Sequence, residues 1–521
     1  MENFLSSLTF LLTFLMIFIS FKWISSHSKM KKKLPPSPWK FPVIGNLHQL
    51  GSDPHRSLQG LSQKYGPIMH LHLGSVPTLV VSSAEAAHEI MKTHDSSFAN
   101  RPNLTIPNIL LYGCKDIAFS PSGKYWRQLK SMVVKHLLGN AQVTSFQKVR
   151  EKELGRMLDA LGESCGSSVD IGAMFVSLTE NIICSVALGK TSDGSDLKKI
   201  IQTFLDMFTF FSVGTYVPWL SWVDHVTGLV GRAKAVARQF DEFLEGVIEE
   251  HVMKKGAAEA VPNKGKDFVD ILLNVQKDGT TDFTFQRDTV KAVILDVFVG
   301  GIDTAATSLE WVMSELVRHP GAMKKLQHEV TEVAQGRHII AEEDLEKMHY
   351  LKAVIQESLR LHMPAPLLLP RISTQDVKLM GYDIPARTQV IVNAWAIGRD
   401  PMLWEEAEEF RPERFLKNKI DYKGLNFEWL PFGAGRRTCP GIQFGVAIME
   451  LAVANIVYKF DVGLPNGVKH EDVDMSEKYG VILRKKSPLV LTNRSVIVIG
   501  PSIYVCFCGT KYMILVTDQS M

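Results

Sequence analysis

Residues 432–441 read FGAGRRTCPG, and no other stretch of this chain has residue types that point so directly to chemistry. Its glycines let the backbone approach a large, flat ligand, because they carry no Cβ atom. The ionised sulfur of Cys439 is a soft anion that suits iron. Backbone amides near this sulfur, and the start of a helix after Gly441, are expected to lower the pKa of the thiol. A buried structural cysteine is the alternative, but the ten-residue pattern favours a metal ligand.

The first 24 residues carry the pattern of a membrane anchor. Residues 4–21 are almost wholly apolar, and about 20 helical residues at about 1.5 Å each span a hydrocarbon core of about 30 Å. Lysines follow this run at positions 22, 29 and 31–33, and positive charge stays on the cytoplasmic side. A cleaved signal peptide has the opposite order, with basic residues before the apolar run. We expect residues 1–24 to form a single transmembrane helix, with the rest of the chain in the cytoplasm.

Residues 25–46 form a basic and proline-rich segment that ends in LPPSPWKFPVIGN, residues 34–46. Proline fixes φ near −65° and interrupts both helices and sheets. Successive prolines are expected to give a stiff, extended hinge that sets the angle between the anchor and the catalytic domain. An ordinary linker of the same composition would differ from this hinge only in its stiffness.

The rest of the chain reads as one mainly α-helical domain with a minor β-sheet region, over residues 47–494. Helical patterns dominate between residues 84 and 360 and again after residue 441. Short runs rich in β-formers lie at residues 68–73, 78–82 and about 365–395.

The composition excludes several classes of protein. The chain has 521 residues, of which 45% are hydrophobic, so it buries a large core. Its net charge of +3 and the lack of a basic stripe argue against a nucleic-acid partner. The six cysteines have no framework spacing, and the C-x-C pair at 506 and 508 has no further zinc ligands nearby. One chemically active cysteine is the simplest explanation.

Further motifs stand in order with the cysteine loop: WRQLK at 126–130, GGIDT at 300–304, ESLR at 357–360 and PERF at 412–415. With these motifs the chain resembles the cytochrome P450 family, and specifically the plant microsomal members of the 71-clan, from residue 1 to about 494. The resemblance implies a mainly α fold around a buried haem b, whose iron Cys439 holds through its thiolate. It also implies an endoplasmic reticulum protein with one membrane span.

The motif at 300–304 lies in the apolar run 289–317, which is too long and too apolar to be other than a buried helix. Two adjacent glycines inside a helix cost about 1 kcal/mol each relative to Ala, which indicates a need for space or distortion. By resemblance, this groove accommodates dioxygen, the Thr304 hydroxyl hydrogen-bonds the oxygen, and Asp303 helps to relay protons.

The resemblance assigns roles to the other motifs as well. Glu357, Arg360 and Arg414 should form a buried ion-pair cluster that holds the cysteine loop. A second set of residues should contact the haem or its propionates: Trp126, Lys130, Arg371, Phe432, Gly433 and Arg437, with Cys439 as the axial ligand.

The resemblance also places an apolar substrate pocket near residues 106–119, 204–216, 296–304, 365–369 and 479–482. Few charges occur in these segments, which favours a small lipophilic substrate. Asp296, Gly300 and Thr304 stand at i, i+4 and i+8, and therefore on one helix face. Asp296 either faces the pocket or hydrogen-bonds another helix, and the sequence leaves both open. The pocket candidates are Phe211, Asp296, Gly300, Leu367 and Val481.

The implied reaction inserts one atom of O2 into a substrate, or couples oxidation to ring closure or desaturation. Electrons come from NADPH through NADPH-cytochrome P450 reductase, for which basic side chains on the cysteine side offer a docking face. These side chains are Lys124, Arg127, Lys135, Arg436 and Arg437. Terpenoids, alkaloids, and phenylpropanoids including coumarins are all candidate substrates.

Two alternative functions remain open. One is a haem-thiolate dehydratase or isomerase that needs no external O2, against which Asp303 and Thr304 argue. The other is a non-catalytic membrane protein that binds haem or another ligand, against which the complete set of catalytic positions argues.

Residues 495–521 do not fit the resemblance, because chains of the family end soon after a segment like 488–492. We interpret them as an atypical C-terminal extension, produced by read-through or mis-splicing and without a catalytic role.

Overall fold

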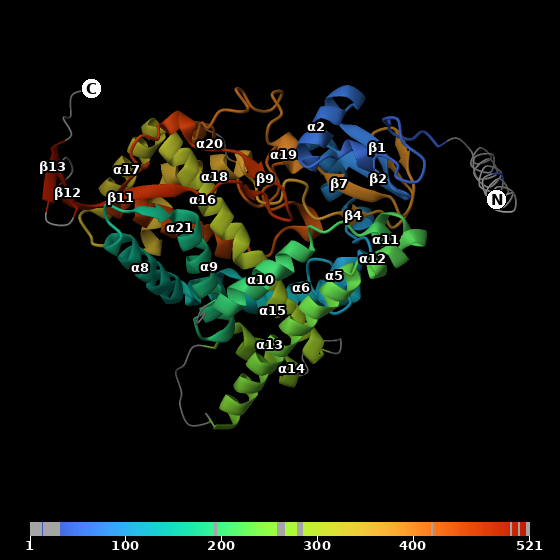
Figure 1. The fold of residues 1–521 in the computed structure, drawn as a ribbon, viewed down its shortest axis with the longest axis horizontal. Coiled ribbons are helices and arrows are strands. Elements are labelled where there is room, and N and C mark those ends of the chain that lie inside the picture. Colours follow the sequence, from blue (N-terminus) through green and yellow to red (C-terminus); the bar gives the residue numbers. More distant parts are fainter. Residues whose placement is uncertain are drawn as a thin grey trace, which may run out of the picture.

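The computed structural model describes most of the chain, and over these residues the chain is mainly helical with small sheets, as predicted (Figure 1). The predicted membrane helix at 1–24 lies outside the described residues except for Thr13. The described residues are 32–191, 195–257, 266–278, 285–417, 420–500, 503–508 and 511–516, with Thr13.

Long apolar helices form the centre of the fold. Helices α15 (Arg287–Gly301) and α16 (Asp303–Arg318) follow one another across the molecule, and α16 packs against three other helices. These are α9 (Ile171–Leu188), α18 (His349–Leu361) and α21 (Ile442–Lys459). By length and composition α9, α21 and the α15–α16 run are apolar enough to cross a membrane, but 61–67% of each span is buried inside the fold. They are therefore core helices.

The glycine pair coincides with an interruption of the long helical run formed by α15 and α16, which is called the distal helix below. α15 ends at Gly301, α16 begins at Asp303, and Ile302 between them has a ψ of −69°. The Thr304 hydroxyl donates to the Gly300 carbonyl at 2.6 Å, which occupies a backbone acceptor beside the break. The distortion expected from two adjacent glycines is thus confirmed, and the predicted run 289–317 is covered by two helices in place of one.

A small sheet lies at one end of the molecule, in the order β1-β2-β7-β4 (Figure 1). The hairpin of β1 (Ile68–Leu73) and β2 (Val76–Val81) turns at Gly74, whose φ is +62°. β7 (Gln389–Val392) pairs with β2 in parallel, and β4 (Arg371–Ile372) pairs with β7. The predicted run 68–73 matches β1, whereas β2 begins two residues before the predicted 78–82.

The proline-rich segment is fastened to this sheet over its described part. The His70 N–H donates to the Pro36 carbonyl at 2.9 Å, and the Asn46 N–H donates to the His72 carbonyl at 2.6 Å. The Asn46 side chain accepts from the His72 N–H at 2.8 Å. The stiffness of residues 35–46 therefore comes from pairing with β1 as well as from the prolines.

A second sheet contains the end of the chain. β11 (Val490–Gly500) pairs with β3 (Ser168–Asp170), β8 (Phe460–Gly463) and β12 (Ile503–Cys508), and β12 pairs with β13 (Lys511–Val516). The predicted boundary between residues 494 and 495 falls inside β11, so the backbone of the sheet continues across it. The origin of residues 495–521 stays a hypothesis.

The remaining elements surround this core. They are α2 (Pro54–Tyr65), α3 (Ala84–His88), α4 (Asp95–Phe98), α5 (Thr105–Leu110), α6 (Lys124–Val133), α7 (Asn140–Ser145), α8 (Gln147–Glu163), α10 (Ser195–Met207), α11 (Val213–Tyr216), α12 (Trp222–Val226), α13 (Leu229–Ala257), α14 (Phe268–Asp278), α17 (Pro320–Ala334), α19 (Ala394–Ile397), α20 (Glu413–Lys417), β5 (Val377–Leu379), β6 (Tyr382–Ile384), β9 (Glu477–Lys478) and β10 (Arg484–Lys485).

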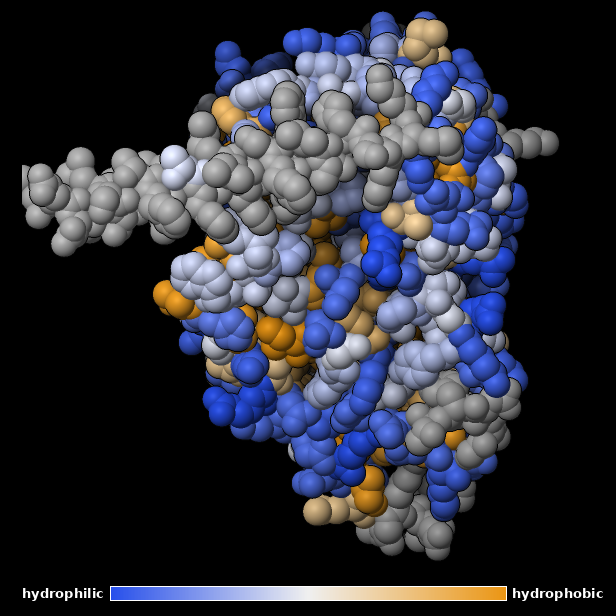
Figure 2. All heavy atoms as spheres, turned by 90° about the vertical axis from the view of Figure 1, so that its right-hand side faces the viewer, coloured by the Kyte–Doolittle hydropathy of each residue, from blue (hydrophilic) through white to orange (hydrophobic). Residues whose placement is uncertain are grey.

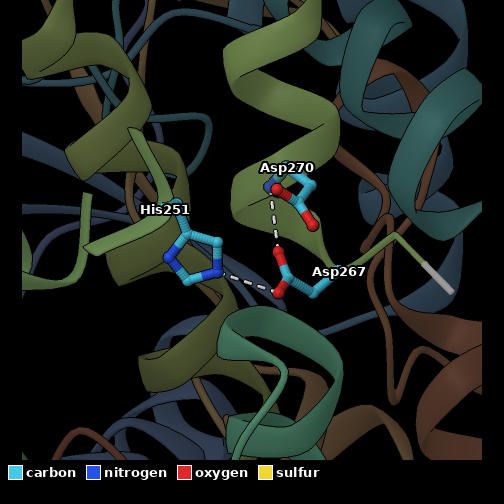
Figure 3. Close-up of side chains that lie close together, drawn as sticks. All are labelled: His251, Asp267 and Asp270. Atoms are coloured by element: carbon cyan, nitrogen blue, oxygen red, sulfur yellow. Dashed lines mark hydrogen bonds and ion pairs between the residues drawn. The ribbon is translucent and has the colours of Figure 1, made fainter. Parts of the chain in front are cut away.

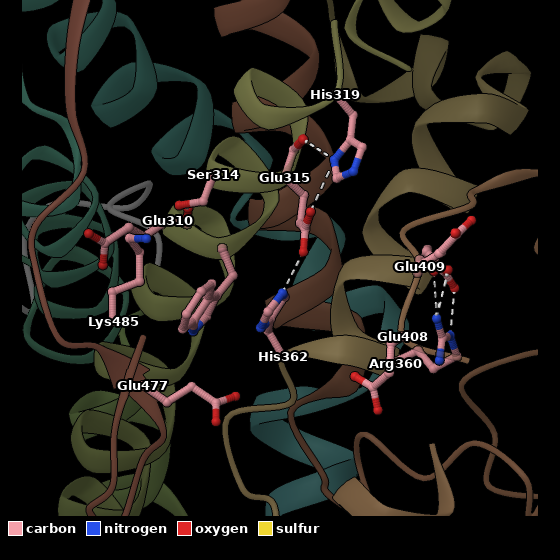
Figure 4. Close-up of polar contacts among 12 residues, drawn as sticks. Glu310, Ser314, Glu315, His319, Arg360, His362, Glu408, Glu409, Glu477 and Lys485 are labelled. Carbon is pink, nitrogen blue, oxygen red and sulfur yellow. Dashed lines mark hydrogen bonds and ion pairs between the residues drawn. The ribbon is translucent and has the colours of Figure 1, made fainter. Parts of the chain in front are cut away.

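A buried ion-pair cluster joins α18 to the segment that follows β7. Glu357 binds Arg360 at 2.7 Å and Arg414 at 2.9 Å, and the side chains of Glu357 and Arg360 are fully buried. Arg360 also donates to the carbonyls of Gly398 and Ala407, both at 2.6 Å, and to that of Glu409 (Figure 4). Every guanidinium edge therefore meets an acceptor, which a buried cation requires.

The cluster reaches the cysteine loop indirectly. Its hydrogen bonds to other described segments end on residues 398–414, but Phe415 of α20 lies 5.1 Å from Trp429, ring centre to ring centre. Trp429 contacts Tyr422 at 5.1 Å, and Tyr422 contacts Phe432 of the cysteine loop at 5.6 Å. Tilted and edge-to-face aromatic contacts thus connect the triad to the cysteine loop, which the resemblance led us to expect the triad to hold.

A second buried acid crosslinks α16 and the end of α18. Glu315 binds His362 at 2.6 Å and His319 at 3.2 Å (Figure 4). Burial raises the pKa of Glu315, but hydrogen bonds from His319 and His362 outweigh it and lower the pKa to about 2. The His362 ring stacks on Trp311 at 4.0 Å. This network holds the two helices that carry the oxygen-side motif and the ESLR motif.

Replacing the central acid of the triad is expected to destabilise the fold severely. Glu357→Gln leaves two buried guanidinium groups without their counter-charge, which costs about 3–5 kcal/mol. Urea unfolding of the purified chain measures the loss. Glu332→Gln, on the solvent side of α17, is the matched control and should change stability by about 0.5 kcal/mol at most. Equal stability of the two variants would contradict the cluster's role.

Candidate functional site

The cysteine loop is closed on itself immediately before α21. The Cys439 N–H donates to the Phe432 carbonyl at 3.0 Å, and the Cys439 sulfur accepts from the Gly441 N–H. Gly433 and Gly435 have φ values of +64° and +69°, which L side chains rarely adopt. A Cβ at Gly435 would lie 2.2 Å from the Met91 carbonyl oxygen. The loop therefore needs glycine for both its turns and its close packing.

The expectation of a lowered thiol pKa is wrong for the net shift. Burial raises the pKa of Cys439, and the opposing effects of the Gly441 N–H and of Lys130 do not overcome it. The amide acts in the predicted direction, but removing the thiolate from water has the larger effect. A bound metal ion deprotonates a coordinating thiol outright, so ionisation of this sulfur would accompany metal binding.

Arg437 ties the cysteine loop to a distant part of the chain. Its guanidinium donates to the carbonyls of Ala99 at 2.8 Å, Ile117 at 3.0 Å and Ser120 at 2.5 Å. It also stacks over the Trp126 ring at 4.0 Å. The Trp126 indole N–H donates to the same Ile117 carbonyl at 3.0 Å. Burial lowers the pKa of Arg437 to about 10.

Two more predicted cations lie beside the loop. Lys130 of α6 donates to the carbonyls of Arg436 at 2.6 Å and Thr438 at 3.1 Å, and burial lowers its pKa to about 8. Arg371 of β4 donates to the Ala434 carbonyl at 2.9 Å and binds Asp95 at 3.3 Å. The structure thus brings Arg437, Lys130 and Arg371 together around the cysteine loop.

A fourth cation, Arg101, was not predicted. It is buried and donates to the carbonyls of Ala118, Leu369 and Pro370, each at 2.8 Å. Burial lowers the pKa of Arg101, and the charges of Arg437 and Arg371 lower it further. A single arginine after α4 has no local signal in the sequence, because its role comes from packing against residues about 270 positions away.

These residues fit a haem with a thiolate ligand. The carboxylates that face the four cations are Asp95 and Asp116, so the cluster has an excess of buried positive charge. The two propionates of a haem would balance this excess through charge-assisted hydrogen bonds. The Cys439 sulfur would supply a soft thiolate donor next to the same cluster. Arg371, Arg437 and Lys130 would hold the propionates, and these contacts stay predictions. The single indole N–H of Trp126 donates to the Ile117 carbonyl instead.

Asp296, Gly300 and Thr304 form a strip along one face of the distal helix, the oxygen-side strip. This strip borders open space at Gly300. Gly300 is exposed and Asp296 and Thr304 are half-buried, although most other residues of α15 and α16 are buried. A Cβ at Gly300 would meet no atom within 4 Å, whereas a Cβ at Gly301 would lie 2.6 Å from Ile183 Cδ1. Gly300 therefore leaves room on the strip, and Gly301 permits close packing against α9.

Asp303 faces the other side of the helix from this strip. Its carboxylate pairs with Arg484 of β10, and Arg484 also donates to Gln202 at 3.2 Å. Both residues line a cleft of about 660 Å³ between α9, α10 and α16. Burial raises the pKa of Asp303, and Arg484 acts against this shift. Asp303 and Thr304, predicted as a pair, thus serve opposite faces of the helix.

The structure settles the contact of Asp296. Its carboxyl accepts from the Ile117 N–H at 2.6 Å, so its partner is a loop before α6 and not another helix. The charge of Asp116, a buried acid that the sequence reasoning missed, raises the pKa of Asp296. A lone aspartate in the apolar run DIAFS was a signal that it needed a buried partner.

The other pocket candidates are scattered. Leu367 is half-buried and packs against the β1–β2 hairpin, and its neighbour Leu368 lies nearest the position of a Cβ on Gly433, at 3.8 Å. Val481 is half-buried in the turn between β9 and β10. Phe211 is 52% exposed and stacks on Tyr216 at 5.1 Å. Leu367 and Leu368 both belong to the predicted pocket segment 365–369, whereas Phe211 lies among surface hydrophobic residues.

A cluster of His251, Asp267 and Asp270 has the residue types of a metal site, but its contacts are those of a helix junction (Figure 3). His251 Nδ1 bonds the Val247 carbonyl at 2.8 Å, and Nε2 bonds Asp267 at 2.9 Å. Asp267 also caps α14 by accepting from the Asp270 N–H at 2.9 Å. Both ring nitrogens are thus engaged in joining α13 to α14.

Comparisons with known proteins agree with this site. The cytochrome P450 family model matches residues 35–492. The chain is 65% identical to cytochrome P450 Tp4149 of Tanacetum parthenium, over 94% of this chain and 99% of the relative. It is 53% identical to a 3-beta-hydroxylase of the same species, over 92% and 96%.

A solved structure of similar fold supports the same assignment. A zebra fish cytochrome P450 with progesterone has a TM-score of 0.73 and 27% identity, and the match covers 84% of this chain and 99% of that one. The family match, the high identity to plant relatives and the thiolate-type cysteine loop all agree. The chain belongs to the cytochrome P450 family, whose members are haem-thiolate monooxygenases.

Proposed function

We propose that this chain oxidises a small, lipophilic plant specialised metabolite by hydroxylation, epoxidation or oxidative cyclisation, with Cys439 as the axial ligand of its haem. The observation that carries the proposal is the arrangement around the haem site. Cys439 and four buried or half-buried cations lie on one side, and the open strip of Gly300 and Thr304 belongs to the distal helix. O2 and NADPH-derived electrons are the expected co-reactants.

The chain's own residues would position the reactants and move protons. Haem with a thiolate ligand supplies the oxygen activation, because thiolate donation favours O–O cleavage. The Thr304 hydroxyl donates to the Gly300 carbonyl, and turning its single O–H away from this carbonyl would let it donate to O2. Asp303 is paired with Arg484, and both residues line the cleft. Through this cleft Asp303 can exchange protons with solvent.

The pocket side favours neutral substrates. The carboxyl on the open strip, Asp296, is already engaged by Ile117 and Asp116, so it offers no free anion to a cationic substrate. The relative named 3-beta-hydroxylase supports hydroxylation as the reaction. Terpenoids, alkaloids and phenylpropanoids including coumarins are the substrate classes that we propose to screen.

A surface of hydrophobic residues supports location at the endoplasmic reticulum membrane, with the catalytic domain in the cytoplasm. Trp219 and Trp222 are 65% and 59% exposed. The backbone around Tyr216 contacts the β1–β2 turn, which in turn bonds to residue 44. Figure 2 shows hydrophobic residues between hydrophilic ones on this side of the molecule. The hydrophobic patch comprises Trp39, Phe41, Val43, Ile44, Phe210, Phe211, Trp219, Trp222 and Val226.

The predicted docking face for NADPH-cytochrome P450 reductase is exposed except at one residue. Lys124 and Arg127 of α6 project to solvent, as do Lys135 and Arg436. Arg437 is turned inward onto three carbonyls and is therefore not available to a partner. The other four charges support docking of an acidic surface.

Turnover in membranes tests the reaction itself. Microsomes that contain the full-length chain and the reductase should consume O2 in an NADPH-dependent way when a candidate substrate is present. One atom of ¹⁸O2 should appear in a hydroxylated product, as mass spectrometry detects. Product formation without NADPH and O2 would instead support the dehydratase or isomerase alternative.

Cys439→Ser tests the axial ligand. The variant should lose the Soret shift that thiolate ligation gives to the ferrous, carbon-monoxide-bound haem, together with turnover, because a hydroxyl does not donate as a thiolate does. Absorption spectra of the full-length protein measure this. Cys165→Ser, a half-buried cysteine of the same fold, is the matched control and should keep both properties. An unchanged spectrum in Cys439→Ser would overturn the ligand assignment.

Tryptophan quenching tests the hydrophobic patch. In bilayer discs that contain brominated lipids, the full-length chain should show quenched tryptophan fluorescence. Trp219→Phe with Trp222→Phe should remove a large part of the quenched component, because both side chains would enter the interface. Trp404→Phe, a buried residue, should leave it unchanged. Equal quenching in all three proteins would argue against contact of the patch with lipid.

A further inference from the structure

The loop 112–123 is held from both sides at one residue. On one side the Ile117 N–H donates to Asp296 of α15 at 2.6 Å. On the other side the Ile117 carbonyl accepts from Trp126 and Arg437, both at 3.0 Å. Ile117 therefore connects the distal helix to the cation cluster of the cysteine loop. The protonation state of Asp296 should consequently affect the position of the loop 112–123.

A second acid of the same loop lies against Asp296. Asp116 has 0% exposure, and its Oδ2 accepts from the Phe119 N–H at 2.8 Å. Its other oxygen, Oδ1, is buried and has no hydrogen-bond partner among the described residues. Asp116 directly precedes Ile117, whose N–H binds Asp296, so the two acids are held next to each other. Ionised carboxylates only accept hydrogen bonds, so a proton on one of the two acids would give Asp116 Oδ1 the partner that it lacks.

The surroundings favour one proton on the pair. Burial raises the pKa of both acids, and the charge of Asp116 raises that of Asp296 further. Two like charges in contact in a buried site cannot both ionise at the ordinary aspartate pKa. The charged and titratable groups that face the pair are Arg101 and Arg437 beyond the loop, and Cys114 and Tyr125 beside it.

We propose that Asp116 and Asp296 share one proton, and that this acid pair positions the loop 112–123 as a wall of the substrate pocket. Asp296 and Asp116 are thus positioning residues that act through the backbone of Ile117 and Phe119. The inference rests on the proposed function only in naming the loop a pocket wall. The sharing of the proton concerns the chain itself and is tested without turnover.

A pH dependence with a definite sign follows from this pair. Because the folded pKa is raised, the folded state binds a proton that the unfolded state has released above about pH 4. The contribution of the pair to stability is therefore full at low pH and declines as the pH rises through the folded pKa. Above that pH two charged carboxylates face each other, and the Ile117 and Phe119 amides should exchange with solvent more readily.

Asparagine substitutions distinguish a shared proton from two separate carboxylates. Asp296→Asn keeps the shape of a protonated acid, since its oxygen accepts from Ile117 and its amide donates to Asp116. Asp296→Ala removes both contacts. Asp288→Asn is the matched control, because Asp288 lies on the same helix and binds Lys115 of the same loop at 2.7 Å, outside the pair.

Infrared spectroscopy and hydrogen exchange of the full-length holoprotein in bilayer discs provide the readouts. At neutral pH the wild type should show the carbonyl stretch of one buried protonated carboxyl, which either Asp296→Asn or Asp116→Asn removes and Asp288→Asn keeps. Amide protection of residues 116–119 should fall about tenfold in Asp296→Ala, the effect of one lost hydrogen bond to a buried acid. Asp296→Asn should retain this protection and abolish its decline at high pH.

Three results would overturn the proposal. The first is a wild-type spectrum without a protonated-carboxyl band that the Asn variants remove. The second is an Asp296→Asn protein that loses protection of residues 116–119 as Asp296→Ala does. The third is a wild type whose protection shows the same pH dependence as Asp296→Asn. If Asp296→Ala fails to fold, the infrared bands and the pH series of Asp296→Asn still decide. A failure of turnover with these results intact would concern the proposed function alone.

Discussion

The half-buried guanidinium of Arg437 makes the contact on which the geometry of the haem site depends. A guanidinium that is removed from water needs an acceptor for each of its edges. Arg437 finds these acceptors in the carbonyls of Ala99, Ile117 and Ser120, and its flat face lies on Trp126. Because these residues precede the cysteine loop by more than 300 positions, one side chain fixes the sulfur relative to the helix that flanks the propionate side.

The cysteine loop is supported independently from its other side. There the link consists of aromatic rings, from Phe415 through Trp429 and Tyr422 to Phe432, and it begins at the Glu357 cluster. Ion pairs have strict geometry, whereas packed aromatic rings transmit position through close contact. The cysteine loop is thus held on one side by the hydrogen bonds of Arg437 and on the other by the aromatic contact of Phe432. Among the described residues, its link to the triad runs through these rings.

The sequence allowed the fold class and most of the site to be predicted, because those features depend on local patterns. The glycine pair anticipated the interruption at Ile302, and the FGAGRRTCPG loop anticipated the backbone around Cys439. Arg101 and Asp116 were not singled out from the sequence, since their roles come from neighbours far away in the chain. The direction of the Cys439 pKa was also wrong, because local amides can be read from a sequence but the depth of burial cannot. The aromatic link between the triad and the loop had no motif to reveal it.

The two adjacent glycines of the distal helix have different surroundings and therefore different roles. Gly301 is confined by Ile183, whereas Gly300 borders open space. A small side chain introduced at position 300 would change the shape of the reaction chamber and leave the helix packing as it is. Such a chain can therefore acquire new regiochemistry by steps at one position, while the neighbouring position preserves the architecture that oxygen chemistry requires.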